Sequence, residues 1–207
     1  TPKVYYVESG ALPLKIVAIG SSSTAGAGAS SPDQSYPAQL QVELEELMRR
    51  VPVTVVNRGV NGEESRDMLA RFERDVFSEK PDLVLWQVGS NSVLRDRPLS
   101  EAPAPLNQGL KLLKEHGADV VLINPQYAPK VLLHRQAEAV VRLIGALAHQ
   151  TGAALFRRFE LMRFWHERHL GYEQFLDPDQ LHMNDWSYGC LANALATAMI
   201  RTVGSSQ

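Results

Sequence analysis

The chain has 207 residues, of which 21% are charged, and its formal net charge is −2. A chain of this length buries one substantial core without disulfides or metals, so we expect a single domain over residues 1–207. The near-neutral charge leaves no broad basic field, which argues against nucleic acid or an anionic membrane surface as a partner. No apolar run approaches the ~20 residues of a spanning helix, so we predict no membrane span.

The compartment is only weakly indicated by the sequence. A single cysteine, Cys190, excludes an internal disulfide and a cysteine metal cage, but exported and cytosolic proteins both contain lone thiols. The chain starts at Thr1-Pro2, with neither an initiator Met nor a signal-peptide pattern, so either a leader was removed or the chain was trimmed. We favour a periplasmic or secreted location over the cytoplasm, and the oligomeric state stays open.

Short β-branched runs alternate with longer amphipathic segments along the whole chain. The runs predict strands at 14–19, 53–56, 83–88, 120–123 and 153–156. The amphipathic segments predict helices near 37–50, 64–77, 105–116, 133–150 and 185–203. Pro37 fits a first helical turn, and Gly117 and Gly152 fit helix ends. This alternation predicts an α/β fold of three α/β/α layers around a mostly parallel sheet of about five strands.

The segment 157–176 mixes aromatic and charged side chains more densely than the rest of the chain. Its basic residues alternate with Glu160 and Glu167, which is typical of a solvated helix face; they are Arg157, Arg158, Arg163 and Arg168. The segment leads directly into an Asp-x-x-His pair. We therefore expect it to contribute to a substrate pocket.

Four separated motifs carry residues that ester cleavage needs. In chain order they are Gly20-Ser21-Ser22-Ser23-Thr24, Asn57-Arg58-Gly59-Val60-Asn61-Gly62, Gly89-Ser90-Asn91-Ser92 and Asp179-Gln180-Leu181-His182. Each of the first three follows a predicted strand. Ligands of open α/β sheets bind at the carboxyl ends of the strands, where Gly20, Asn57, Gly89 and Asn124 are all expected.

Ser22 is the predicted nucleophile, since the turn between Gly20 and Gly26 would expose its hydroxyl. A hydroxyl needs a base, and His182 is the best candidate because imidazole titrates near neutral pH. Asp179 would orient the imidazole, with Asp177 as its competitor. The alternative is that Asp179 and His182 only cap the last helix.

Charge on the carbonyl oxygen of the transition state requires pre-aimed donors. Gly62 can offer a backbone N–H, Asn91 a side-chain amide, and Ser22 its own backbone N–H. Taken singly, Gly62 could be a turn glycine and Asn91 a capping residue.

Together these motifs resemble the SGNH hydrolases, also called the GDSL lipase/esterase family. The resemblance implies a flavodoxin-like α/β/α fold with Ser22 as nucleophile, Gly62 and Asn91 in the oxyanion hole, and Asp179 with His182 completing the triad. Two blocks depart from the family pattern. In the first, Ser21 stands where an aspartate is usual and Ser23 where a leucine is usual, and in the third Ser92 stands where an aspartate is usual.

We therefore predict a serine ester hydrolase that removes a short acyl group, most simply acetyl, from a polar or sugar-like alcohol, with no cofactor and no metal. The predicted substrate contacts are Tyr127, Trp165, Tyr172 and Phe175; these aromatics could instead be core residues. The same constellation would serve a thioesterase, a lysophospholipase or an O-acetyltransferase. Two non-enzymatic alternatives are an inactive SGNH domain that binds carbohydrate or a partner, and a flavodoxin-like module that binds phosphate at the turn 21–26.

Overall fold

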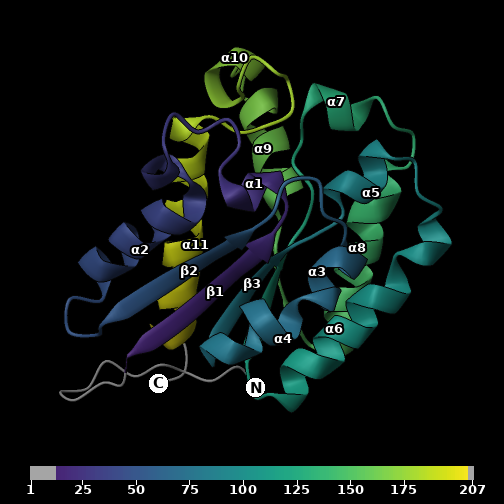
Figure 1. The fold of residues 1–207 in the computed structure, drawn as a ribbon. Coiled ribbons are helices and arrows are strands. Elements are labelled where there is room, and N and C mark those ends of the chain that lie inside the picture. Colours follow the sequence, from purple (N-terminus) through teal and green to yellow (C-terminus); the bar gives the residue numbers. More distant parts are fainter. Residues whose placement is uncertain (1–12, 205–207) are drawn as a thin grey trace.

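The computed structural model describes residues 13–204 and contains a five-stranded parallel sheet of order β2-β1-β3-β4-β5 (Figure 1). The strands are β1 (Leu14–Gly20), β2 (Val53–Gly59), β3 (Leu83–Gln87), β4 (Asp119–Ile123) and β5 (Ala154–Phe156). All four pairings are parallel. The order 2-1-3-4-5 is that of flavodoxin-like folds. The predicted α/β/α class and the five strands are confirmed.

The sequences of β1 and β3 explain why they lie at the centre. Residues 16–19 and 83–87 are buried, which requires both faces of the sheet to be covered. Strands covered on both faces have continuous apolar runs instead of alternating ones. The edge strands differ, because β2 has several part-exposed residues and β5 is only three residues long.

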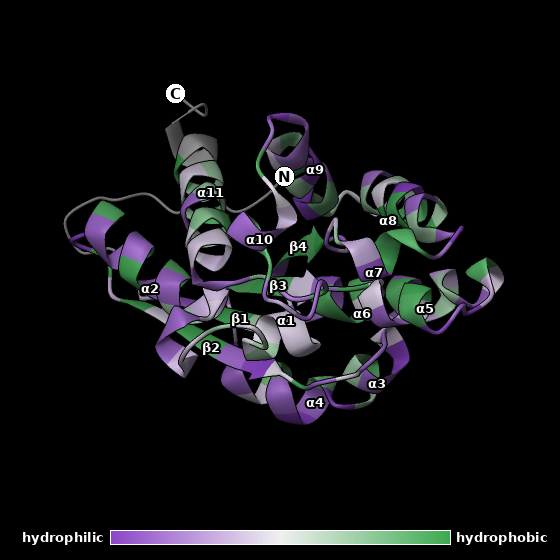
Figure 2. Ribbon diagram, turned by 90° about the horizontal axis from the view of Figure 1, so that it is seen from above, coloured by the Kyte–Doolittle hydropathy of each residue, from purple (hydrophilic) through white to green (hydrophobic). Residues whose placement is uncertain are grey.

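Helices cover both faces of the sheet (Figures 1 and 2). On one side α2 (Tyr36–Leu47) packs against α11 (Asp185–Gly204). On the other side lie α3 (Ser65–Ala70), α4 (Phe72–Asp75), α6 (Pro103–Glu115) and α8 (Ala137–Thr151). In this second layer α6 contacts both α3 and α8. No helix among residues 13–204 is long and apolar enough to cross a bilayer.

The predicted long helices are present with shifted ends, and the segment 64–77 divides into α3 and α4 at Arg71. Gly117 and Gly152 have φ values of +73° and +74°, as helix-ending glycines should. Four helices were not in the predicted set: α1 (Ser22–Ala25), α5 (Ser90–Leu94), α7 (Pro129–Leu132) and α10 (Tyr172–Phe175). Each has only four or five residues, too few for a periodicity to appear. A longer helix, α9 (Arg158–Glu167), lies in the segment whose charges indicated a helix face.

One basic residue contradicts the predicted solvated helix face. Arg158, the first residue of α9, is fully buried, whereas Arg157, Arg163 and Arg168 keep exposed surface. Its Nε donates to the backbone oxygen of Asn124 at 3.0 Å, just after β4. Arg158 is therefore a structural link between α9 and the sheet.

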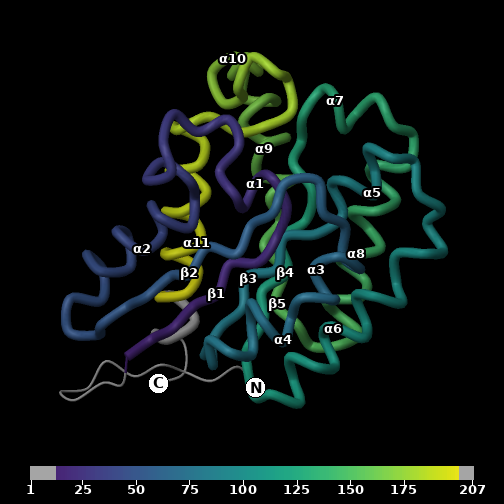
Figure 3. The backbone as a smooth tube through the Cα atoms, in the orientation of Figure 1, coloured from purple at the N-terminus to yellow at the C-terminus, as the bar shows by residue number. Residues whose placement is uncertain are grey.

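The loops that follow β1, β3 and β4 gather at one end of the sheet, together with the segment around α10 (Figure 3). In the sheet, β2 lies on one side of β1 and β3 on the other, so the strand order reverses between β1 and β3. This position is a topological switch point. Such points are where open α/β sheets bind ligands.

Two helical glycines provide a test of the packing between layers. A Cβ on Gly109 of α6 would lie 2.3 Å from the Trp86 ring, whereas a Cβ on Gly145 of α8 would meet nothing closer than 3.8 Å. We expect Gly109→Ala to lower the free energy of unfolding by about 1–3 kcal/mol through overpacking. Gly145→Ala should raise it by about 0.5–1 kcal/mol, because alanine favours the helix. Urea unfolding measures both, and equal effects would contradict the close approach of α6 to Trp86.

Candidate active site

Ser22 is the first residue of α1 and lies two positions after the end of β1. Its side chain faces His182, the last residue of the fourth motif. The Ser22 Oγ lies 2.8 Å from Nε2 of His182, although 160 positions separate the two residues in the sequence. Ser21 and Ser23 are each only 1% exposed. Of these three serines, only Ser22 therefore offers its hydroxyl to the imidazole.

The turn that carries Ser22 is anchored to both neighbouring strands. The Oε1 of Gln87, at the end of β3, accepts hydrogen bonds from the backbone N–H and the Oγ of Ser21, both at 2.9 Å. Asn57 of β2 donates to the backbone oxygen of Thr24 at 2.8 Å. Ser21, which stands where the family usually has an aspartate, is thus an interior donor that fixes the turn.

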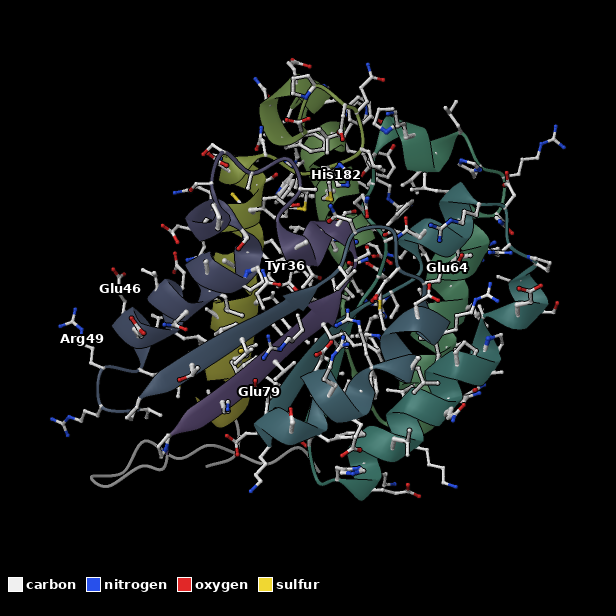
Figure 4. All side chains as sticks on the ribbon, viewed as in Figure 1. Tyr36, Glu46, Arg49, Glu64, Glu79 and His182 are labelled. Carbon is white, nitrogen blue, oxygen red and sulfur yellow. The ribbon has the colours of Figure 1, made fainter. Side chains whose placement is uncertain are left out.

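His182 and Asp179 form the second half of the arrangement. The Nδ1 of His182 lies 2.5 Å from Oδ2 of Asp179, while Oδ1 of Asp179 accepts from the backbone N–H groups of Leu181 and His182, each at 2.9 Å. Asp177 instead accepts from the backbone N–H of Asp179 at 3.2 Å. Asp179, and not Asp177, therefore contacts the imidazole (Figure 4 labels His182).

Two opposing effects act on the pKa of Asp179. Burial raises it, but the backbone N–H of His182, the His182 ring and the backbone N–H of Leu181 stabilise the carboxylate and hold the pKa below its usual value. Asp179 is consequently ionised at neutral pH, and its Oδ2 can accept a hydrogen bond from the Nδ1–H of the ring.

Helix capping is done by a different residue. Asn184 precedes α11, and its Oδ1 accepts from the backbone N–H of Ser187 at 3.1 Å. Ser187 Oγ in turn donates to the backbone oxygen of Phe175 at 2.6 Å. The alternative that Asp179 and His182 only cap the last helix is therefore wrong.

Two of the candidate oxyanion donors come from other elements than Ser22: Gly62 lies in the turn after β2, and Asn91 lies in α5. Gly62 has φ +79°, in the region that favours glycine, and Val60 of the same turn donates to the backbone oxygen of Gly20 at 3.0 Å. Asn91 Nδ2 donates to the backbone oxygen of Glu63 at 2.9 Å, which leaves its second amide hydrogen available. Among residues 13–204 no acceptor is found for the backbone N–H groups of Ser22 and Gly62.

The predicted substrate residues do not all have the same environment. Tyr127 and Tyr172 are partly exposed, and their rings are stacked with centroids 6.3 Å apart. Helix α7, which begins two residues after Tyr127, contacts the His182 loop, residues 177–184. The contact is a hydrogen bond from the backbone N–H of Lys130 to the backbone oxygen of Gln180 at 3.3 Å. Burial, with the Tyr127 hydroxyl as a second cause, raises the pKa of Tyr172 to about 12.

Phe175 corrects one of these predictions, because it is fully buried and has no surface for a substrate. Its ring contacts Trp165, which is partly exposed, at a centroid distance of 5.8 Å. Sequence reasoning overlooked Trp186, which is 48% exposed and lies 5.3 Å from Trp165 between ring centroids. Its position four residues after His182 was the available signal.

His166 stacks on Tyr172 at 4.3 Å between ring centroids. Within the described part of the chain, no group of three or more His, Cys, Asp or Glu residues is arranged to hold a metal ion.

Gly28 is a further residue that sequence reasoning overlooked. It has φ +88°, and a Cβ there would lie 2.4 Å from the backbone oxygen of Met183 and 2.9 Å from Cβ of His182. The loop after α1 therefore touches the His182 loop directly. The only sequence signal for Gly28 was its place in the tripeptide Gly26-Ala27-Gly28. This spacing does not reveal that the His182 loop lies against Gly28.

Comparison with known proteins identifies the family of the chain. A model of the non-GDSL lipase-like family matches residues 2–205. The chain belongs to this family. The assignment to the SGNH hydrolases is thereby confirmed.

Individual relatives extend the comparison. An arylesterase of Vibrio mimicus is 26% identical over 187 residues, covering 90% of this chain and 88% of the relative. The esterase TesA of Pseudomonas aeruginosa is 30% identical over 175 residues, covering 81% and 78%. The solved structure of Axe2, an acetylxylan esterase from Geobacillus stearothermophilus, is 23% identical with a TM-score of 0.77, over 93% of this chain and 95% of that one, which shows a shared fold.

We expect Gly28→Ala to reduce kcat at least tenfold, because the new methyl group would displace the His182 loop and lengthen the contact between Ser22 and His182. Steady-state hydrolysis of p-nitrophenyl acetate measures the loss. Gly117→Ala is the control, since Gly117 has a similar φ of +73° but a Cβ there meets nothing within 4 Å. If both variants lose the same activity, general destabilisation and not loop displacement is the cause.

Proposed function

We propose that the protein is a serine carboxylic ester hydrolase in which Ser22, His182 and Asp179 act as the catalytic triad. The observation that carries this proposal is the continuous relay from Ser22 Oγ through the His182 ring to Asp179, with contacts of 2.8 and 2.5 Å. The membership of the family and the names of its esterase relatives support the same reaction class.

The reaction follows from the positions of these atoms. Ser22 Oγ attacks the carbonyl carbon of the ester while Nε2 of His182 takes its proton, and Asp179 stabilises the resulting imidazolium. The tetrahedral intermediate collapses when Nε2 returns the proton to the leaving alcohol, which leaves an acyl group on Ser22. A water molecule then repeats the sequence, releasing the carboxylic acid and restoring Ser22.

The oxyanion is assigned to the backbone N–H groups of Ser22 and Gly62 and the second amide hydrogen of Asn91. One pre-aimed donor of this kind lowers the barrier by about 3–4 kcal/mol. Donors without an intramolecular acceptor are suited to this role, because no existing bond must break when the charge develops.

The substrate is proposed to be a short acyl ester of a polar or sugar-like alcohol. The segment after Tyr127 contacts the His182 loop through the hydrogen bond from Lys130 to Gln180. Tyr127, Tyr172 and Trp165 give partly exposed rings, and polar side chains alternate with the aromatic ones along 157–176. Such a mixture suits a sugar ring, which has apolar faces and a polar edge, better than a long acyl chain. The relatives reported above are named as esterases, which favours water as the acyl acceptor. A periplasmic or secreted location stays a prediction.

Ser22→Ala should lower kcat with p-nitrophenyl acetate by several orders of magnitude without unfolding the protein, and His182→Ala should approach the same loss because triad members act as a unit. Asp179→Asn should reduce activity more than Asp177→Asn, its matched control, since only Asp179 touches the imidazole. Mass spectrometry after fluorophosphonate treatment should locate the adduct on Ser22. An adduct on Ser21 or Ser23, or the reverse order of the aspartates, would show that the triad is misassigned.

Tyr127→Ala and Tyr172→Ala should reduce kcat/KM for acetylated xylo-oligosaccharides at least fivefold more than for p-nitrophenyl acetate, because the small ester needs no sugar contact. The comparison of the two substrates is the measurement. Phe175→Leu serves as the buried control, and it should lower Tm while leaving the ratio of the two activities unchanged. A ratio that is unchanged in the tyrosine variants as well would assign these rings to the core.

A further inference from the structure

Helix α5 makes polar contacts with three consecutive residues of the turn that carries Gly62. Asn91 donates to the backbone oxygen of Glu63 at 2.9 Å. Four residues later, Arg95 donates from Nη2 to the backbone oxygen of Gly62 and from Nη1 to Oε1 of Glu64, both at 2.8 Å. Asn91 and Arg95 lie one helical turn apart, so one face of α5 and its end hold the whole turn.

The far anchor of this turn is a buried carboxylate. Glu64, labelled in Figure 4, precedes α3 as the capping residue of a reciprocal capping box with Asp67. Only 7% of it is exposed. Burial raises the pKa of Glu64, but Arg95 and then Arg97 outweigh that effect and lower it. Glu64 is therefore a charged and fixed acceptor at neutral pH.

The geometry of Arg95 suits the linking of two acceptors. A guanidinium group presents its N–H donors in a rigid plane, so one side chain can fix a carbonyl oxygen and a carboxylate together. A Cβ on Gly62 would lie 3.5 Å from Nη2 of Arg95, which shows how closely the group follows the turn. The Gly62 oxygen belongs to the peptide plane that follows Gly62, whereas the Gly62 N–H belongs to the plane that precedes it. Arg95 fixes the plane that follows, and the Glu63 N–H of the same plane donates to the backbone oxygen of Val60 at 3.4 Å. The turn 60–63 is thereby closed around the plane that carries the Gly62 N–H, which limits how far this N–H can rotate.

We propose that Arg95 is a positioning residue that aims the Gly62 N–H at the oxyanion. This inference rests on the proposed esterase function. Arg95 touches neither Ser22 nor His182, and it acts through the Gly62 turn. The side chain is assigned no proton transfer and no nucleophilic role, because its contacts are to the Gly62 oxygen and to Glu64.

Arg97 provides a matched control on the same carboxylate. Its Nε donates to the same Oε1 of Glu64 at 3.1 Å, and the two side chains are almost equally exposed, at 44% for Arg95 and 43% for Arg97. Only Arg95 contacts the Gly62 oxygen among the described contacts. Substitution of either arginine would therefore remove an ion pair to Glu64. Only substitution of Arg95 would also remove the hydrogen bond to the Gly62 oxygen.

The experiment compares Arg95→Gln with Arg97→Gln in the full chain, with p-nitrophenyl acetate as substrate. We expect Arg95→Gln to lower kcat by about 10–100-fold, less than the 10²–10³-fold expected for Asn91→Ala, because a misaimed donor loses only part of its effect. KM should change less than threefold, and Arg97→Gln should keep kcat within about twofold of the wild type. Equal losses in the two arginine variants, or a change confined to KM, would overturn the inference.

A second measurement does not depend on ester cleavage. The backbone N–H groups of Glu63 and Glu64 are hydrogen bonded to Val60 and Asp67, so loosening of the turn should speed their exchange with deuterium. We expect faster exchange in Arg95→Gln than in Arg97→Gln, by mass spectrometry of the peptide that covers 60–67. Unchanged exchange would overturn the inference even in an active enzyme. An inactive wild type would refute the proposed function and the catalytic role of Arg95, while the exchange rates would still decide whether Arg95 holds the turn.

Discussion

The side-chain oxygen of Gln87 is the point on which the position of Ser22 depends. This buried atom, at the end of the central strand β3, accepts hydrogen bonds from the Ser21 backbone, the Ser21 hydroxyl and, at 3.3 Å, the Thr24 hydroxyl. A buried acceptor with several donors is costly to displace, because each lost partner leaves a polar group unsatisfied. The turn before Ser22 is thereby tied to the sheet, and Ser22 is left to face His182.

The network continues from Gln87 through Ser90 to Gln126 and Arg158. The Nε2 of Gln87 points to Ser90 Oγ at 3.4 Å, and Ser90 donates to Oε1 of Gln126 at 2.7 Å. Arg158 donates to the same Gln126 oxygen at 2.9 Å, and burial lowers the pKa of this arginine to about 10. The loops after β1, β3 and β4 and the start of α9 thus share one set of buried hydrogen bonds. Such a set favours a single arrangement, since displacing one member would leave several buried polar groups without a partner. Among the described residues, Nη1 of Arg158 is a buried donor for which no acceptor is found.

Much of the fold could be predicted from the sequence, because the signals that specify it are local. The five strands follow from β-branched runs, and the helix ends at Gly117 and Gly152 follow from glycines with positive φ. The carboxyl ends of parallel strands meet at one edge, which places the first three motifs together. The contact of Ser22 with His182, and of His182 with Asp179, could be predicted only from the chemistry of these residue types and from the resemblance to the SGNH hydrolases, because 179–182 do not directly follow a strand of the sheet. What failed depended on long-range burial: Arg158 looked like a surface charge and Phe175 like a pocket residue, and each is fully buried.

The residues that sequence reasoning overlooked share a property, which is that each works through a loop distant in the chain. Gly28 leaves room for the His182 loop, Gln87 holds the Ser21 turn, and Arg95 holds the Gly62 oxygen. A sequence motif is recognised by the residues that contact the substrate. The distance between two loops is instead set by contacts from one loop to the other, which involve residues outside the motifs. Since an alkoxide, a base and an oxyanion donor must agree to within about 0.5 Å, these cross-loop contacts determine whether the motif residues can act together. Ser21 illustrates the consequence: its hydroxyl donates into the interior, so a serine at this position can anchor the turn without a carboxylate.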